Sequence, residues 1–600
     1  MSTALRTLAV AVATALSSAV LTAALPSAVA VAAGDPDTAA WERTGRPERL
    51  MVIRPGTVAL VSRGTVVRRL YPQAGAVPLS WLAANTGHDW VSRQAGEDSA
   101  VAVRTAVLLT PGTTLRIGPD TGKVLFAAGS TAASGTWIRG SRATLEVRDA
   151  TLASVGEDGK EPAAEDAAGR PYLLMGAGGR LDLDHSTVSG FGLPGSGPGL
   201  SGFSGVTWGK GSTGSAAGSS FVGNRTGLRL AGSTGVKLSD VTVKGSLEDG
   251  VVLNRDAGTV IENLTSQDNG RNGLTASGTD GRALTGIGTS GNRGSGIKAT
   301  AQSGLRLTGV TSQGDQGGGI RLVSCAQCAV DTATVHGAPV ALAVSGAGSD
   351  VSVDEPHFST GTTGISLAAG ISGATVSGGT VQGFERGIAV SGSDVTIRQT
   401  AVSDSPTAIT VYGQARQVSL EGVTVRGGRV GVTASDTTSG VALTDVRVSG
   451  TTRKGLSSAS PGLRVTGGSV SGATTAVDLG ASARLDHLTI SGARRGLHVA
   501  AGVHASGTAL DVLAERKGIE VGRDGRMDLT DSRVRAPIAL FGPGTVHRGG
   551  RTQVTLPPFP WLGFAALLAL TLAAGMQTVH QVRHRRTPAP QVASHVRNTA

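Results

Sequence analysis

"GLRLAGSTGVKLSDVTVKGSLED" (Gly227–Asp249) is followed directly by "GVVLNRDAGTVIENLTSQDNGRN" (Gly250–Asn272), and the two 23-residue segments align without a gap. Each begins with glycine and has an aliphatic residue at its second and fourth positions. A further aliphatic match is Leu238 with Ile261. Aliphatic residues that recur with a period of two are typical of strands with one buried face. The stretch therefore predicts a repeat made of short β-strands.

The same unit recurs along most of the chain at intervals of 19 to 25 residues. The unit begins at Gly227, Gly250, Gly273, Gly296, Gly319, Pro339, Gly364, Gly387, Ala408, Gly431, Gly455, Ala476, Gly496, Gly518 and Pro537. The residue that follows is aliphatic in every unit, including Val340 and Ile538. No helical pattern separates the strands, so only other strands of the same coil can connect parallel neighbours. The sequence predicts an all-β fold, a right-handed parallel β-helix of about 22 residues per coil, in which each coil buries its face against the next.

Composition favours one long repetitive body over several domains. Of 600 residues 90 are glycine and 3 % are aromatic, without the triplet period of collagen. The net charge of +11 permits an acidic polymer as partner without requiring one. We expect no nucleic-acid partner.

Both ends are predicted to be addressing segments. Residues 1–33 combine Arg6, an apolar stretch and small residues at Ala28 and Ala30, which is typical of a secretory signal peptide. Residues 559–579 are uncharged and long enough to cross a bilayer, and the basic segment 580–600 follows. The prediction is a single-pass protein of the cell membrane with an extracellular body and a basic cytoplasmic tail.

Between these ends we expect three regions. Residues 34–105 form a β-rich cap, residues 106–545 form the β-helix, and residues 546–558 form a proline-containing linker. Within the β-helix, residues 187–220 are rich in Gly and Ser and are expected to form a long loop that is functional or mobile.

Cys325 and Cys328 are the two cysteines, in "SCAQC" at a predicted turn. For an exported protein we expect a local disulfide bond. One pair supplies only two ligands, so we expect no structural zinc. We expect no cofactor. Calcium stays open as an unsupported alternative, since it would need converging carboxylates and the acidic pairs of this sequence are scattered.

Asn224, Asn269 and Asn292 precede the repeat glycines by three or four residues. Asparagine hydrogen-bonds the backbone of its own turn. We therefore expect an asparagine ladder inside a turn of the coil, with a structural role.

The segment from Arg170 to Asp280 resembles the mannuronan C5-epimerase family. "RPYLL" (Arg170–Leu174) and "GGRLDLDHSTVSGFG" (Gly178–Gly192) are similar to the family's R-P-F segment and the strand after it. "GVVLNRDAGTVIENLTSQDNG" (Gly250–Gly270) is similar to the family's H-G-I-x-x-S-R rung.

In that alignment Arg255 matches the family's arginine, while Asp249 stands where the family has histidine. The family's D-P-H-D segment falls on "GLRLAGS", where Arg229, Leu230, Ala231 and Gly232 occupy its places. The resemblance implies a polysaccharide setting and argues against intact epimerase chemistry.

Three functions remain open. The leading hypothesis is a membrane-anchored β-helix that binds or helps process a cell-envelope or exopolysaccharide, with Arg229, Lys298 and Arg321 as outward ligand-binding residues. The second is an active lyase or epimerase with a divergent catalytic set, namely Asp249, Arg255, Asp256 and Asp268. The third is a structural rod, for which we expect uniformly small, polar outer columns such as those after Gly431.

Overall fold

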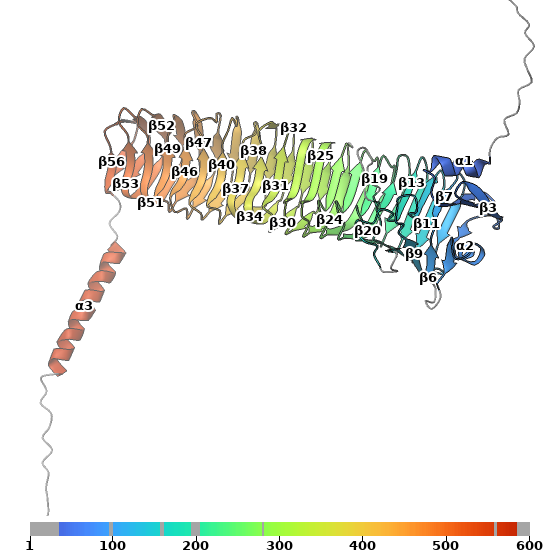
Figure 1. Ribbon diagram of the computed structural model, residues 1–600. Helices are drawn as coiled ribbons and strands as arrows, with labels where there is room; N and C mark the ends of the chain where they lie inside the picture. The colour runs from blue at the N-terminus through green and yellow to red at the C-terminus, as the bar shows by residue number, and fades with distance from the viewer. Residues whose placement is uncertain are drawn as a thin grey trace, which may run out of the picture.

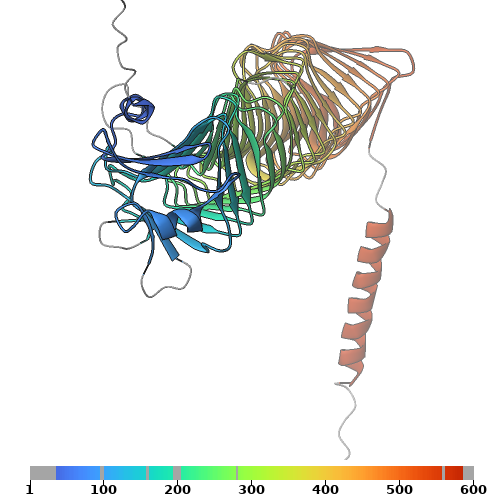
Figure 2. The same cartoon turned by 90° about the vertical axis from the view of Figure 1, so that its right-hand side faces the viewer.

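The computed structural model describes residues 35–94, 100–156, 161–193, 204–278, 281–556 and 561–584, with only the backbone given for 561–564 and 583–584. The predicted signal peptide and most of the basic tail lie outside these ranges. The described chain from α1 to β56 forms a long rod of stacked coils (Figure 1). The turned view follows the coils along the rod (Figure 2).

Each coil contributes to three parallel ladders, which we call the first, second and third ladder. The first ladder is built from β7 (Ala106–Leu109), β10 (Trp137–Ser141), β13 (Tyr172–Gly176), β16 (Val206–Trp208), β19 (Leu228–Ala231), β21 (Val251–Asn254), β23 (Leu274–Ser277), β25 (Ser295–Ser303), β28 (Gly318–Ala326), β31 (Val340–Ser345), β34 (His357–Leu367), β37 (Thr380–Val390), β40 (Thr407–Val411), β43 (Val430–Ala434), β46 (Lys454–Ser458), β49 (Thr475–Leu479), β51 (Thr489–Val499), β53 (Asp511–Val521) and β56 (Ile538–Phe541).

The second ladder is built from β8 (Thr114–Ile117), β11 (Thr144–Arg148), β14 (Arg180–Asp184), β17 (Thr213–Ala217), β20 (Lys237–Lys244), β22 (Val260–Gln267), β24 (Ala283–Ser290), β26 (Arg306–Thr308), β29 (Ala329–Asp331), β33 (Ser352–Asp354), β36 (Thr375–Ser377), β38 (Val395–Arg398), β41 (Val418–Glu421), β44 (Ala442–Thr444), β47 (Leu463–Thr466), β50 (Ala483–Asp486), β52 (His504–Thr508), β54 (Arg526–Thr530) and β57 (Thr545–Gly549).

The third ladder shares the long strands β20, β22, β24, β34, β37, β51 and β53, which turn a corner of the coil. Its other strands are β6 (Ala100–Val103), β9 (Lys123–Ala127), β12 (Thr151–Val155), β15 (Thr187–Ser189), β18 (Ser220–Val222), β27 (Thr311–Gln313), β30 (Thr334–His336), β39 (Ala401–Ser403), β42 (Thr424–Arg426), β45 (Arg447–Ser449), β48 (Ser469–Ser471), β55 (Arg533–Arg535) and β58 (Gln553–Thr555). The short strands β32 (Gly348–Ser349) and β35 (Ile371–Ser372) widen one corner.

The register confirms the predicted aliphatic column in the regular part of the repeat. Leu228 pairs with Val251, Val251 with Leu274, and Leu274 with Ile297. These side chains are fully buried in one continuous core. Like residues therefore stack on like residues inside the rod, as a solenoid requires.

The predicted column is wrong at two units, those that begin with proline. Ile320 pairs with Leu342 instead of Val340, and Ile519 pairs with Leu540 instead of Ile538. A slip of two residues keeps the same face of a strand, so alternation alone cannot detect it. The repeat glycine donates its backbone N–H to the neighbouring coil. Proline has no backbone N–H and cannot take this position in the ladder.

The predicted asparagine ladder is confirmed inside the coil for Asn269 and Asn292, whereas Asn224 is buried apart from them and donates to Val188 O and Gly227 O. Asn269 N and Nδ2 donate to Asn292 Oδ1 at 3.0 and 2.8 Å, and Asn292 N and Nδ2 donate to Asp315 Oδ1 at 2.9 and 2.8 Å. Asp315 Oδ2 accepts from the hydroxyls of Thr289 and Ser312, both at 2.7 Å. All three ladder side chains are fully buried, so the ladder ends on a buried carboxylate that has four donors.

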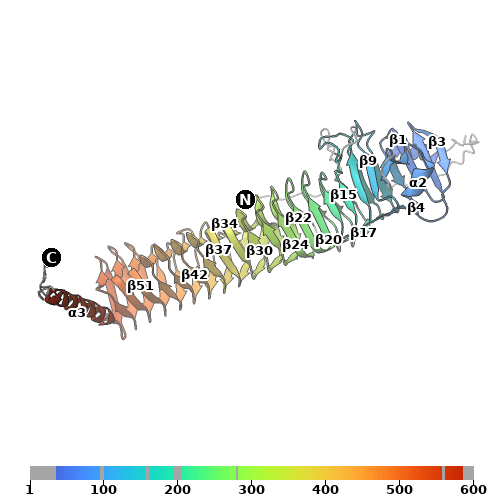
Figure 3. The same cartoon turned by 90° about the horizontal axis from the view of Figure 1, so that it is seen from below.

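The cap region holds β1 (Arg49–Arg54), β2 (Thr57–Ser62), β3 (Thr65–Leu70), β4 (Val77–Pro78), β5 (Val91–Arg93) and two helices, α1 (Pro36–Arg43) and α2 (Leu79–Asn85). These elements gather at one end of the rod (Figure 3). β1 pairs in parallel with β7 and antiparallel with β2, so it continues the first ladder while β2 and β3 turn away from it. β6, also within the predicted cap region, already belongs to the third ladder.

The long loop predicted for residues 187–220 is wrong for its described part. These residues supply β15, β16, β17 and β18, and the side chains of Phe191 and Trp208 are fully buried in the core. Gly and Ser are common here because the coil turns tightly, and aromatic residues fill the interior behind them. Residues 194–203, which include Phe203 of the same prediction, lie outside the described ranges.

After β58 the chain continues to α3 (Trp561–His584), which is apolar enough from Ala565 to Val582 to cross a membrane by length and composition. The described part of the predicted proline linker, residues 546–556, contains most of β57 and all of β58, which pair with β54 and β55 as the last coil of the rod. Residues 557–558 of that linker and residues 559–560 of the predicted membrane segment lie outside the described ranges.

Candidate functional site

The outer side of the first ladder gathers the predicted ligand-binding residues into one column. Lys298 of β25 pairs in register with Arg321 of β28. Arg229 lies in the same column, three coils before Lys298. Val252 and Thr275 occupy this column on the two coils between Arg229 and Lys298. Arg321 is exposed, and the other two cations are half-buried.

None of these three cations has an acidic partner among the described residues. The Nε of Arg229 is buried without a hydrogen-bond partner. A guanidinium or ammonium group held on a strand face without a counter-charge is available to an anionic ligand.

The N-terminal end of this face carries an aromatic cluster that sequence reasoning missed. The Arg139 guanidinium lies 4.5 Å from the ring centroid of Trp137 and 5.0 Å from that of Tyr172. Burial lowers the pKa of Arg139 to about 10. Trp137 and Tyr172 pack with Ala40 of α1, so the cluster joins the cap to the first coils. The sequence could have indicated this cluster, because aromatic residues, Trp137 and Tyr172, begin two successive strands of the first ladder.

The four predicted catalytic residues are not brought together. Asp249 Oδ1 accepts from Asn272 N and Nδ2 at 3.0 and 2.8 Å, in a hydrogen-bonded row on the outside of the coil. Arg255 occupies a left-handed turn position with φ 51° at the end of β21. Asp268 lies at another corner, 3.8 Å from Lys244 Nζ. A joint catalytic role for these residues stays a prediction.

Asp256, the fourth of them, is fully buried in an ion pair. Its Oδ1 accepts from Arg282 Nη2 at 2.5 Å, and the exposed fractions of the two side chains are 0 and 2 %. Burial lowers the pKa of Arg282, and the neighbouring Asp256 opposes that shift. Asp256 Oδ2 and Arg282 Nη1 have no hydrogen-bond partner in the part of the chain that the structure describes.

An open concavity of about 630 Å³ lies beside this pair. It is lined by Gly258, Thr259, Val260, Ile261, Glu262, Asn263, Gly281, Arg282, Ala283 and Thr285. Arg282 is thus the one buried cation of its lining. The ion pair joins the turn after β21 to the turn after β23, at the corner between the first and second ladders.

A second set of polar side chains meets on the first ladder near the C-terminal end. His498 Nδ1 lies 2.6 Å from Asp478 Oδ1, and Lys454 Nζ contacts Asp478 Oδ2. Burial by itself raises the pKa of Asp478, but hydrogen bonds from Lys454 and His498 lower it by more, so this pKa lies below its usual value. A carboxylate on one ring nitrogen orients an imidazole for proton transfer at the other.

Glu520 of β53, in the first ladder one coil after His498, forms ion pairs with two more cations. Arg495 Nε lies 2.7 Å from Glu520 Oε2, and Lys517 Nζ lies 3.1 Å from Glu520 Oε1. The expectation of uniformly small outer residues after Gly431 is therefore wrong. The signal was in the sequence, since Asp478, His498 and Glu520 each stand two residues after the start of a repeat unit.

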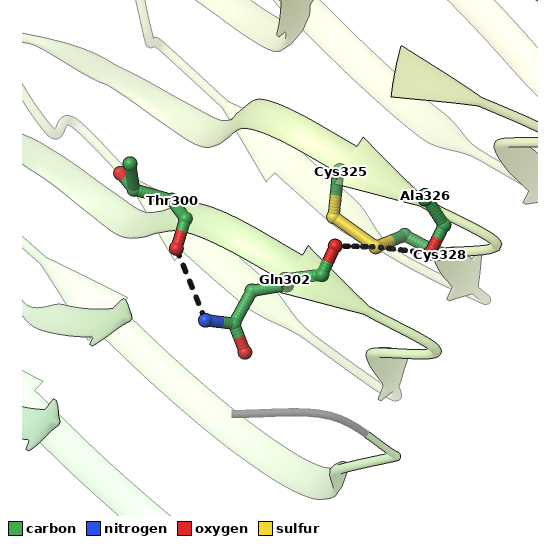
Figure 4. The surroundings of a disulfide bond; sticks show 5 residues. All are labelled: Thr300, Gln302, Cys325, Ala326 and Cys328. Carbon is green, nitrogen blue, oxygen red and sulfur yellow. Dashed lines mark hydrogen bonds between the residues drawn. A yellow bond between two sulfur atoms is a disulfide. The ribbon is translucent and has the colours of Figure 1, made fainter. Parts of the chain in front are cut away.

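Cys325, near the end of β28, and Cys328, in the turn that follows, form a disulfide bond beside Gln302 of the preceding coil (Figure 4). Their Cα atoms are 6.0 Å apart, within the usual range for such a bond. Among the described residues, no group of three or more His, Cys, Asp and Glu could hold a metal ion.

Comparison with known proteins agrees with this architecture. The family model for the right-handed beta helix region matches residues 204–358 and 295–452, so this part of the rod is a right-handed β-helix. No curated protein matches the chain.

Similar solved structures include the periplasmic alginate epimerase AlgG, at 12 % identity and a TM-score of 0.29 over 77 % of this chain and 88 % of that one. An alginate lyase from Paenibacillus sp. str. FPU-7 is 11 % identical, with a TM-score of 0.24 over 61 % and 92 % of the two chains. The Dettilon tailspike protein is 13 % identical, with a TM-score of 0.32 over 45 % and 59 %.

Proposed function

We propose that this right-handed parallel β-helix binds an anionic extracellular polysaccharide along the outer side of its first ladder. The observation that supports the proposal most directly is the column of Arg229, Lys298 and Arg321. These cations share one face, stand on parallel strands and have no acidic partner among the described residues.

The geometry suits a linear ligand. Neighbouring strands of a sheet are about 4.8 Å apart, so successive outward side chains form an evenly spaced row along the rod. Charged sugars of one polymer chain can contact Lys298 and Arg321 on adjacent coils and Arg229 three coils from Lys298. Many weak contacts then add up to useful avidity.

We further propose that the protein is tethered to the cell membrane by α3, with the rod on the extracellular side. The apolar stretch of α3 supports this placement, as do the predicted signal peptide and the arginines that follow the helix in the sequence. A tethered rod would hold the polymer close to the cell surface.

Catalysis on a uronate polymer is the second candidate. The Asp478–His498 pair with Lys454 favours it, because removal of a proton beside a carboxylate needs an oriented base and a cation near the carboxylate. Incubating the protein with uronate polymers, while following unsaturated product by ultraviolet absorbance and C5 inversion by NMR, tests this candidate. Turnover that the His498→Ala variant loses would support it.

Reversing two charges of the column is expected to weaken glycan binding. The double variant Lys298→Glu, Arg321→Glu replaces two attractive contacts by repulsive ones, and we expect about tenfold weaker binding to oligogalacturonate. The full chain in neutral detergent would be titrated into labelled oligomer, and Kd read from fluorescence anisotropy at low and high salt.

The matched control is Arg447→Glu, Arg464→Glu. Both of these arginines are exposed and lie on strands outside the first ladder, β45 and β47. The control changes the net charge equally and is expected to alter Kd less than twofold. Equal weakening by both double variants, or no binding by the wild type to any uronate or neutral glycan, would contradict the proposed function.

A further inference from the structure

Four arginines follow one another along the edge of the first ladder near its C-terminal end. They are Arg429, Arg453, Arg494 and Arg516, which we call the arginine row. Each directly precedes a residue of the register column Val430, Lys454, Thr475, Arg495 and Lys517. Thr474 fills the coil between Arg453 and Arg494.

All four side chains of the row are exposed, and none has an acidic partner among the described residues. The column behind the row differs in this respect. There Lys454 is paired with Asp478, and Arg495 and Lys517 are paired with Glu520. Asp478 and Glu520 are thus paired with the cations of this column behind the row, which we call the inner column. Exposed Glu515 is the one acidic residue next to the arginine row in sequence.

Unpaired like charges on neighbouring coils repel one another, and an anion between them removes that repulsion. Arginine is suited to this because its planar fork of N–H donors matches a carboxylate or a phosphate with two parallel hydrogen bonds. The five coils from Arg429 to Arg516 span about 19 Å at the usual strand spacing. That span exceeds a single phosphate or carboxylate and fits a chain of them.

We propose that the arginine row is a second binding surface, specific for a linear polyanion whose carboxylate or phosphate groups repeat along its chain. The polymer lies parallel to the rod axis, because the row runs from coil to coil and the coils stack along the rod (Figure 3). Binding to a lipid surface is the alternative, which the experiment below separates from polymer binding. The proposal extends the proposed function, yet it depends on different residues and can fail alone.

The test uses the double variant Arg494→Glu, Arg516→Glu of the full chain in neutral detergent. Labelled oligogalacturonate and labelled polyphosphate supply the carboxylate and phosphate forms of the ligand, and Kd is measured by fluorescence anisotropy. We expect about tenfold weaker binding of at least one probe, with the loss reduced at high salt. The probe that responds more strongly identifies the charged group.

Three comparisons decide the outcome. The control Arg447→Glu, Arg464→Glu must stay within about twofold of wild type, since an equal loss there would reduce the effect to net charge. If only Lys298→Glu, Arg321→Glu weakens polymer binding, the proposed function stands and the arginine row is not a polymer site. If Arg494→Glu, Arg516→Glu impairs binding to phosphatidylglycerol vesicles but to neither polymer, the proposal is overturned in favour of a lipid surface.

Discussion

Asp256→Ala is expected to lower the free energy of unfolding of the coils around β21 and β22 by about 3–5 kcal/mol. The substitution leaves Arg282 as a buried cation without a counter-charge, because its exposed fraction is only 2 %. Transfer of an unpaired charge out of water is costly, and Arg282 Nη1 already has no partner among the described residues. The corner that joins the first and second ladders should therefore loosen before the rest of the rod.

Hydrogen exchange measures this effect where it occurs. Solenoid coils open locally, so the amides of β21 and β22 are expected to lose about two to four orders of magnitude of protection, while distant coils such as β46 change little. The control is Asp268→Asn, which removes the charge of an exposed carboxylate on the same coil and keeps a side chain that tolerates the left-handed backbone there (φ 56°), so about 0.5 kcal/mol or less is expected.

A third variant separates the charge from the packing. Asp256→Ala, Arg282→Met removes both charges and should recover much of the loss, as replacement of buried pairs by apolar side chains often does. A loss below about 1 kcal/mol for Asp256→Ala alone would show that water reaches Arg282, and would contradict the burial argument.

Asp315→Ala is expected to cost about 3 kcal/mol or more, because it removes the acceptor of four buried donors. The backbone and side-chain N–H groups of Asn292 and the hydroxyls of Thr289 and Ser312 all donate to this carboxylate. None of these groups can turn to bulk water, since the carboxylate lies at the end of an interior ladder.

Thermal unfolding and hydrogen exchange of β24 and β25 would measure the loss. Asp315→Asn is the informative comparison, because its amide keeps one acceptor oxygen and matches Asn269 and Asn292 of the same ladder. We expect it to lose clearly less stability than Asp315→Ala. Equal losses for the two variants would mean that the charge, and not the number of accepted hydrogen bonds, stabilises this position.

The columns of the β-helix were predictable because stacking is periodic. Leu228, Val251 and Leu274 must meet when the coil length is constant at 23 residues, and the register places them together. The asparagine ladder followed from the same spacing. Where the spacing changes, at the proline-led units before Leu342 and Leu540, the prediction slipped by two residues.

The candidate sites depended on information that spacing does not contain. Asp256 and Asp268 looked alike as charged turn residues, yet one is buried against Arg282 and the other faces solvent. Likewise, the inner column and the arginine row are both basic in sequence, and only the side-chain contacts show that Asp478 and Glu520 neutralise the inner one.

The sequence by itself therefore determined the solenoid, its core columns and the positions whose side chains point outward, because these follow from a period of two along a strand and a near-constant coil length. Only the tertiary structure decided which outward cations remain unpaired and which carboxylates are buried. The physical reason is that charge pairing depends on contacts of a few ångströms between neighbouring coils, and residues about 20 positions apart in an irregular repeat can shift by that distance without any change in the pattern.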